Sequence, residues 1–472
     1  MRIFVVICLG NFFLHLHHFQ VHSTDDSFIF FRYVDMFSKG FGLRWNPSES
    51  PVEGYSSPLW LLCLIVGNYL SISPLLSSKI IGSISLLLIV FLLHIWEKHA
   101  QIDYWISPFL YTCMGSAYYW GLSGLETSLY ALFFLCSFSA FVFPRFVYCA
   151  PLMALARPEG PILLVVWSVL WWWYQQEKRS HIWLVWIPVI FYGIFRFWYF
   201  SEWLPNTYYA KTGAPLLERI LLGIEYTVPI LMALVFLVIG FRKEKSLLTK
   251  SLICAVLAQT LVIILGGGDW MNWGRLLQPL FPIIIFLAIW LINKKQWISG
   301  VSVCFLLPFA TPVRGFMAIF SGQTLPVEGF QEGGLHQISK EIAADIQANL
   351  AVGSTIAINH AGFIPYYLSE YNFVDMTGLN DSYIAHHASG GLHQKYDSDY
   401  VLKKNPDLII LNSLHLPQKE PFVLDYWIGE TDLYRNPQFT INYQVVDGYY
   451  ERIRFGGGKA YVLLFQKNQR TD

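Results

Sequence analysis

Charged residues are scarce in this chain, at only 14% of its 472 residues, against about 25% in ordinary soluble proteins. The 32 basic and 32 acidic residues cancel, so no charge imbalance points to nucleic acid or a polyanion as partner. No basic tract or RNA-binding signature is present. Hydrophobic residues make up 54% of the chain and aromatic residues 17%. This composition excludes an ordinary soluble domain and indicates a membrane protein.

Paired cysteines are also lacking. The seven cysteines all lie in apolar stretches, none has CxxC spacing, and none follows Cys304. We therefore expect neither disulfides nor a zinc site. A cleavable signal peptide is not expected either, because residues 3–22 have only Arg2 as a basic start and no small-residue cleavage site before Asp25. We expect that segment to remain as the first membrane span.

Long apolar runs are abundant, and a helix needs about 20 apolar residues to cross a bilayer. The sequence predicts eleven spans: 3–22, 74–96, 104–121, 127–143, 146–157, 160–175, 182–200, 219–241, 247–266, 276–293 and 297–317. Residues 146–175 are expected to form a tight helical pair that turns near the outer surface. A further apolar stretch, 57–72, decides the orientation of the chain in the membrane. If it were a span, every later segment would lie on the opposite side of the membrane.

The positive-inside rule favours residues 57–72 lying along the outer interface. With that choice, five short basic turns fall on the cytoplasmic side, and they carry Lys98, Arg145, Lys178, Arg179, Arg242, Lys243, Lys245, Lys294 and Lys295. The N-terminus is then inside. The outer segments are 23–73, the turns near residues 121–126 and 157, 201–218, 267–275, and everything after about residue 318.

The C-terminal third changes character. Residues 321–472 alternate helical and strand patterns: LHQISKEIAADIQANL predicts a helix, STIAINH a strand, DYVLKKNPDLIILN a helix and a strand, and FTINYQVVDGYYERIRF with AYVLLFQ late strands. About 150 residues can bury a core of their own. The predicted fold is therefore an α-helical polytopic membrane domain, residues 1–320, followed by a soluble α/β domain, residues 321–472.

Polar residues gather on the predicted outer side, where ionisable groups next to a bilayer are costly and indicate a site. Asp25 and Asp26 directly follow the first span, and two carboxylates so close favour a raised pKa in one of them, as a general base requires. Glu126 lies in the short turn WGLSGLETSLY. Arg275, after GGGDWMNWG, and Lys211, in WLPNTYYAKTG, are suited to binding a phosphate. This set of groups suits transfer from a lipid phosphate.

The motifs also resemble a known family. TDDSFIFFRYVDMFSKGFGLRWNPSESPVEGYSSPLW resembles the first outer loop of GT-C glycosyltransferases, closest to bacterial terminal arabinofuranosyltransferase-like proteins. The later motifs follow in the family's order: SGLE, ARPEG, LPNTYYAK, GGDWM and DMTGLND. The ordered set covers most of the chain and is more specific than any one piece.

The resemblance implies a polyprenyl-phosphate-sugar donor, an active site on the periplasmic side, and a catalytic aspartate in the first outer loop, either Asp25 or Asp26. The expected catalytic residues are Asp25, Asp26 and Glu126. The expected substrate-binding residues are Arg32, Glu53, Tyr55, Arg157, Glu159, Asn206, Tyr208, Tyr209, Lys211, Asp269, Arg275, His360, Asn380 and Asp381. The implied activity is transfer of arabinofuranose or a hexose to a cell-envelope glycan at the outer face of the bacterial inner membrane.

Several alternatives stay open at this point. Paired carboxylates could hold a divalent cation such as Mg²⁺, Mn²⁺ or Ca²⁺. The acceptor could be a glycan, lipopolysaccharide, a lipid or a protein, and the reaction could invert or retain the anomeric configuration. A transporter or flippase of a lipid-linked saccharide is the alternative function, although no repeated halves are visible. A silent scaffold of an envelope assembly is a third.

Overall fold

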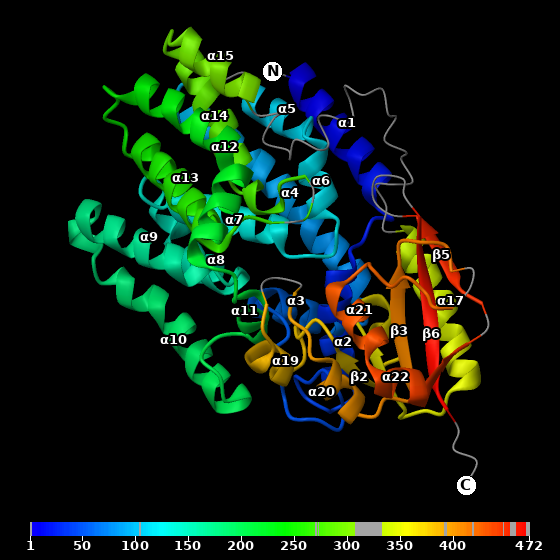
Figure 1. The fold of residues 1–472 in the computed structure, drawn as a ribbon. Coiled ribbons are helices and arrows are strands. Elements are labelled where there is room, and N and C mark those ends of the chain that lie inside the picture. The colour runs from blue at the N-terminus through cyan, green and yellow to red at the C-terminus, as the bar shows by residue number, and fades with distance from the viewer. Residues whose placement is uncertain are drawn as a thin grey trace.

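The computed structural model describes residues 2–102, 105–269, 271, 273–306, 333–390, 394–417, 420–446, 448–453 and 459–468. A bundle of apolar helices forms one part, and a sheet with surrounding helices forms the other (Figure 1). The helices of the first part are α1 (Arg2–Phe19), α2 (Asp25–Ser38), α3 (Pro58–Tyr69), α4 (Pro74–His99), α5 (Ile106–Thr112), α6 (Gly115–Gly121), α7 (Thr127–Ser139), α8 (Cys149–Ala156), α9 (Gly160–Tyr174), α10 (His181–Phe200), α11 (Asn206–Lys211), α12 (Leu216–Phe241), α13 (Leu247–Gly266), α14 (Leu280–Asn293) and α15 (Trp297–Leu306).

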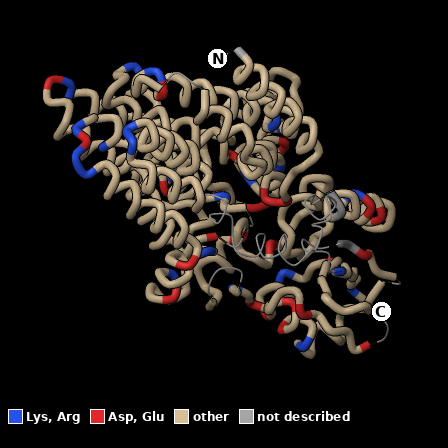
Figure 2. The backbone as a smooth tube through the Cα atoms, turned by 90° about the horizontal axis from the view of Figure 1, so that it is seen from above, with Lys and Arg blue, Asp and Glu red and all other residues tan. Residues whose placement is uncertain are grey.

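Apart from α3, the membrane-type helices of the described residues coincide with predicted spans. Within the described ranges, four helices are long and apolar enough to cross a membrane, namely α4, α10, α12 and α13, and α1, α3, α7, α9, α14 and α15 are shorter apolar helices. The count of eleven spans stays a prediction, and residues 307–317 of the last one lie outside the described residues. Charged residues lie mainly at helix ends and over the α/β part, which leaves the middle of the bundle largely uncharged (Figure 2).

One predicted span is wrong as a continuous helix. The described part of this predicted span, residues 105–121, contains two helices, α5 and α6, and Met114 between them is extended, with a ψ of 93°. The bundle is centred on α14, in which every residue from Leu280 to Leu291 is buried. Its sequence LFPIIIFLAIWLIN is apolar on all faces, as a helix surrounded by other helices requires.

The C-terminal part is an α/β domain with a six-stranded sheet in the order β2-β1-β3-β6-β4, where β5 also pairs with β6. β1, β2 and β3 are parallel, and β6 is antiparallel to β3. The strands are β1 (Thr355–Ile358), β2 (Asn372–Asp375), β3 (Leu408–Ser413), β4 (Tyr443–Val445), β5 (Tyr450–Ile453) and β6 (Lys459–Lys467). The helices are α17 (Gly333–Asn349), α18 (Phe363–Tyr367), α19 (Ser382–His387), α20 (Ser398–Lys403), α21 (Ile428–Arg435) and α22 (Pro437–Asn442).

Most of the pattern predicted for this domain is present. The expected first helix is α17, the STIAINH strand is β1, and the following helix and strand are α20 and β3. The strand predicted at FTIN is wrong, because Pro437 begins helix α22 and the Asn436 side chain accepts the Gln438 N–H at 3.0 Å. The predicted domain boundary, between residues 320 and 321, lies outside the described residues.

A buried carboxylate in this domain leads to a testable prediction. The Glu430 side chain is fully buried, and its Oε1 accepts hydrogen bonds from Asn359 at 2.8 Å and Asn412 at 2.7 Å. Burial raises the pKa of Glu430 to about 7. Since the folded state holds the proton more tightly than the unfolded chain, we expect the contribution of Glu430 to stability to be fully present in acid and to be lost as the pH rises through about 7.

Glu430→Gln keeps the accepting oxygen and carries no charge, so we expect it to remove this pH dependence. The measurement is hydrogen-exchange protection of β1 and β3 amides at pH 5 and pH 8 in the full chain. The same loss of protection at pH 8 in variant and wild type would contradict the assignment.

Candidate functional site

A cavity of about 1300 Å³ lies where the helical bundle meets the α/β domain. Its walls come from segments far apart in the sequence: the start of α2, residues 54–56, the starts of α7 and α9, α11, the first turns of α12, the end of α13, and the turn before α14. The α/β domain contributes Leu379, Gly390 and Gln394. Both parts of the chain therefore build one cavity.

The two adjacent aspartates have different surroundings. Successive residues of an α-helix point about 100° apart, and Asp25 and Asp26 are the first two residues of α2. Asp26 lines the cavity. The carboxylate of Asp25 instead accepts the backbone N–H groups of Gly362 at 3.1 Å and Phe363 at 2.8 Å. Of the two, Asp26 is the aspartate that faces the cavity.

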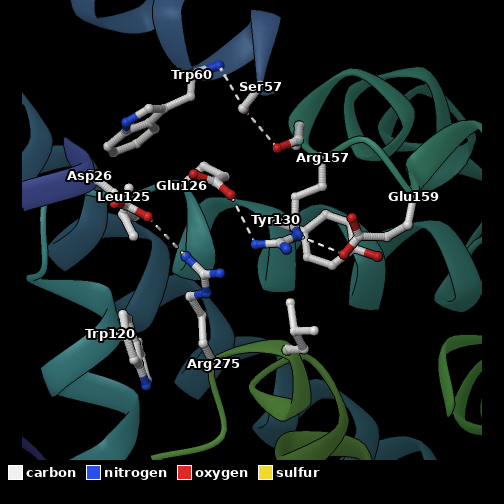
Figure 3. A network of polar contacts seen from close by, with 12 residues as sticks. Asp26, Ser57, Trp60, Trp120, Leu125, Glu126, Tyr130, Arg157, Glu159 and Arg275 are labelled. Atoms are coloured by element: carbon white, nitrogen blue, oxygen red, sulfur yellow. Dashed lines mark hydrogen bonds and ion pairs between the residues drawn. The ribbon is translucent and has the colours of Figure 1, made fainter. Parts of the chain in front are cut away.

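Arg275 lies opposite Asp26, as Figure 3 shows. Its Nη1 is 3.9 Å from Oδ2 of Asp26, and its Nε donates to Oδ2 of Asp269 at 2.7 Å. The guanidinium also lies over the Trp120 ring, 5.7 Å from its centre. Gly268, with a φ of +75°, allows the chain to turn after α13, and a Cβ there would lie 2.8 Å from Tyr226 Cβ. This turn places the Asp269 carboxylate next to the Arg275 guanidinium.

Arg157 is held between two glutamates. Its Nη1 donates to Glu126 Oε1 at 2.9 Å and its Nε donates to Glu159 Oε1 at 2.6 Å (Figure 3). The guanidinium lies 5.6 Å from the centre of the Tyr130 ring. Arg157 and Glu126 are both buried, and all three side chains reach the cavity wall. The triad fixes the start of α7 against the start of α9.

Lys211, the last residue of α11, lines the cavity and has no ion pair within 4 Å in the described part of the chain. Its side chain is exposed and opens onto the cavity among the other groups of the wall. Desolvation by these surroundings and the neighbouring Arg275 charge lower the pKa of Lys211, while Asp26 and Asp269 act in the opposite direction. It is therefore a cation available to an anion in the cavity.

Of the predicted substrate-binding residues, Tyr55, Arg157, Glu159, Tyr208, Lys211, Asp269 and Arg275 line the cavity. The others lie outside its described wall. Asn206 donates to the carbonyls of Gly378 at 2.8 Å and Leu379 at 2.9 Å, and thereby joins α11 to the α/β domain. Glu53 is buried and forms an ion pair with Arg196 at 2.5 Å.

The remaining candidates also make contacts within or between the two parts. Arg32 is fully buried and donates to the carbonyls of Trp45 and Tyr371, and the Tyr209 ring lies 4.1 Å from that of His386. Asn380 donates to Asp375 at 2.9 Å, Asp381 caps α19 at the Ile384 N–H, and the His360 ring centre is 5.8 Å from that of Tyr426. The structure does not bring these residues to the cavity wall.

Sequence reasoning missed one polar face. Glu218, Arg219, Glu225 and Tyr226 line the cavity from the first turns of α12. The Tyr226 hydroxyl accepts the Leu276 N–H at 3.3 Å. The signal that could have found this face is the helical spacing of three charged residues at the start of an otherwise apolar helix. Among the described residues, no three His, Cys, Asp or Glu side chains are grouped to hold a metal ion, and the divalent cation stays a prediction.

Comparisons with known proteins bear on the fold. Residues 330–465 match the family described as "Domain of unknown function (DUF8728)". No curated protein sequence matches the chain. Its structure is similar to the crystal structure of ArnT from Cupriavidus metallidurans bound to undecaprenyl phosphate, with a TM-score of 0.54 and 13% sequence identity, over 98% of this chain and 97% of that chain.

The similarity extends over nearly the whole of both chains and supports the predicted arrangement of apolar helices, while the number of membrane spans stays a prediction. The chain shares the overall fold of that protein, and in this chain the fold consists of a helical bundle and an additional α/β part.

Proposed function

We propose that this protein is a membrane glycosyltransferase. It transfers a sugar, arabinofuranose or a hexose, from a polyprenyl-phosphate donor to a cell-envelope glycan at the outer face of the bacterial cytoplasmic membrane. The observation that carries the proposal is one cavity in which a carboxylate, Asp26, lies beside two cations, Arg275 and Lys211. A base and a phosphate-binding pair are what transfer from a lipid phosphate requires.

The wall of the cavity also suits a lipid chain. Apolar side chains are part of its lining, namely Ile162 of α9, Leu222 and Pro229 of α12, and Val262 and Ile263 of α13. A prenyl chain that packs against these side chains removes apolar surface from water, which is favourable. Small-molecule pockets are usually about 300–1,000 Å³, so a cavity of about 1300 Å³ has room for a lipid headgroup and an acceptor together.

The chemistry proceeds as a direct displacement. Asp26 accepts the proton of an acceptor hydroxyl as that oxygen attacks the anomeric carbon of the donor. The bond between that carbon and the phosphate oxygen breaks, and polyprenyl phosphate leaves. Lys211 and Arg275 stabilise the negative charge that develops on the phosphate. The product of this single displacement has the inverted anomeric configuration.

The orientation is supported by the ends of the helices. The cavity lies at the start of α9, the start of α12 and the end of α13. The basic turns holding Lys178, Arg179, Arg242, Lys243 and Lys245 lie at the opposite ends of these same helices. Because basic turns favour the cytoplasm, the cavity and the α/β domain belong on the outer side.

The phosphate-binding role of Lys211 gives a prediction. We expect Lys211→Ala to weaken binding of polyprenyl phosphate about tenfold to 100-fold, since a hydrogen bond to a charged group contributes about 1.5–3 kcal/mol. Binding is measured by titrating the lipid into purified protein. Lys39→Ala is the control, because Lys39, the C-cap residue of α2, is exposed and contacts Asp35 and Ser369 away from the cavity.

The pH dependence of the same binding is a second readout. Because its pKa is lowered, Lys211 should lose its charge at a lower pH than an ordinary lysine, so binding should weaken as the pH rises. Lys211→Arg keeps the charge and should flatten this alkaline decline. Equal binding by Lys211→Ala and wild type across the pH range would contradict the role.

A further inference from the structure

The helix that carries Asp26 is fixed by another part of the chain. Its N-cap residue, Thr24, makes no side-chain capping hydrogen bond to α2. The Thr24 side chain donates instead to the carbonyl of Ser123, in the turn that precedes Glu126. The start of α2 therefore depends on contacts outside the helix for its position.

The first of these contacts is a pair of hydrogen bonds to the Asp25 carboxylate. Both carboxylate oxygens of Asp25 accept backbone N–H groups, from Gly362, the N-cap residue of α18, and from Phe363, the first residue of that helix. The backbones approach so closely that a Cβ on Gly362 would lie 1.9 Å from the Asp25 carbonyl oxygen and 2.6 Å from its Cγ. Only glycine fits at this position.

Two further contacts lie on the same face of α2, because residues at i, i+3 and i+7 share one side of a helix. The Phe28 ring lies 4.5 Å from that of Phe363, measured between ring centres. The fully buried Arg32 guanidinium donates to the carbonyls of Leu368 at 3.3 Å and Tyr371 at 3.0 Å. One face of α2 is thus attached to residues 362–371, and Asp26 lies off that face.

We infer that the α/β domain acts as the positioning element for the reacting carboxylate, holding Asp26 through the contacts of Asp25, Phe28 and Arg32. Asp25 is a positioning residue and Asp26 the base. The inference rests on the proposed function and deepens it, because it assigns a role to residues 362–371 of the region matched by the family of unknown function. A shift of about 1 Å in a reacting group can cost about 100-fold in rate, so this attachment matters for catalysis.

The test uses three variants and one control variant of the full chain, with the donor that the wild type consumes. Gly362→Ala pushes the start of α18 away from Asp25 without altering any charge, and we expect kcat to fall about 100-fold while KM for the donor stays within about threefold. Asp25→Asn keeps one accepting oxygen and should retain more activity than Asp25→Ala. Gly193→Ala, on α10 with no atom within 4 Å of the added Cβ, is the control and should match wild type.

A structural readout that needs no donor accompanies the kinetics. We expect amide hydrogen exchange in residues 25–32 to speed up in Gly362→Ala and Asp25→Ala while exchange in α14 stays unchanged. Wild-type kcat in Gly362→Ala, or equal losses in Asp25→Asn and Asp25→Ala, would overturn the inference. A wild type that consumes no donor is a different result, since it refutes the proposed function, and the exchange experiment still decides whether α2 is held by residues 362–371.

Discussion

Asp26→Asn is expected to lower kcat for sugar transfer by about 100-fold to 10,000-fold, the contribution typical of a positioned general base. The variant keeps the shape of the side chain and removes its ability to accept a proton. It also leaves the 2.7 Å bond between Arg275 and Asp269 in place, so the phosphate-binding groups stay together. Donor binding should therefore change little. Initial rates with labelled donor, at saturating and limiting concentrations, separate the two effects.

Asp35→Asn is the matched control for this variant. Asp35 lies on the same helix, is partly exposed, and forms an ion pair with Lys39 at 2.8 Å outside the cavity. It carries the same change of one charge and should keep at least half of the wild-type kcat. Wild-type activity in Asp26→Asn would show that another group accepts the proton.

Arg157→Ala is expected to destabilise the protein by about 3–5 kcal/mol, the cost of removing one partner from a buried ion pair. The change would leave Glu126 and Glu159, whose side chains are 6% and 13% exposed, next to each other without a cation. The two carboxylates would then repel across the start of α7 and α9. Thermal unfolding in detergent, followed by a probe in the helical bundle, measures the loss.

Two comparisons make this prediction specific. Lys294→Ala removes an ion pair with Glu244 in which the lysine is 51% exposed, and should change stability by less than about 1 kcal/mol. The triple variant Arg157→Met, Glu126→Gln, Glu159→Gln removes all three charges and should recover much of the lost stability. An Arg157→Ala protein as stable as Lys294→Ala would contradict the account of the triad.

The sequence predicted the convergence of Asp26, Glu126, Arg157, Lys211 and Arg275, which come from separate turns on one side of a bundle. It could do so because apolar runs mark the spans and basic turns mark the opposite side, so residues left in the outer turns must lie near one another. The separation of Asp25 from Asp26 could not be predicted. It depends on which face of α2 packs against Gly362 and the residues after it, more than 330 residues later in the chain.

The roles of Asn206, Asn380 and Asp381 were also beyond sequence reasoning. A polar residue in an outer loop has the same appearance in sequence whether it contacts a substrate or another loop, and these three make contacts with or within the α/β domain. The polar face of α12 was missed for the opposite reason. Glu218, Arg219 and Glu225 were assigned from the sequence to a span or its edge. Most residues of that helix are apolar, so the pattern predicted a membrane span and no polar face.

The most direct test of the account is a donor-consumption assay. Purified wild-type protein and Asp26→Asn are reconstituted in liposomes with a panel of polyprenyl-phosphate sugars labelled in the sugar, and the label is followed together with the release of polyprenyl phosphate. The account predicts that the wild type releases polyprenyl phosphate from one donor and transfers its label to an added glycan acceptor, while Asp26→Asn does neither. Label that crosses the bilayer still attached to its lipid, with no polyprenyl phosphate released from any donor, would contradict it and indicate a flippase.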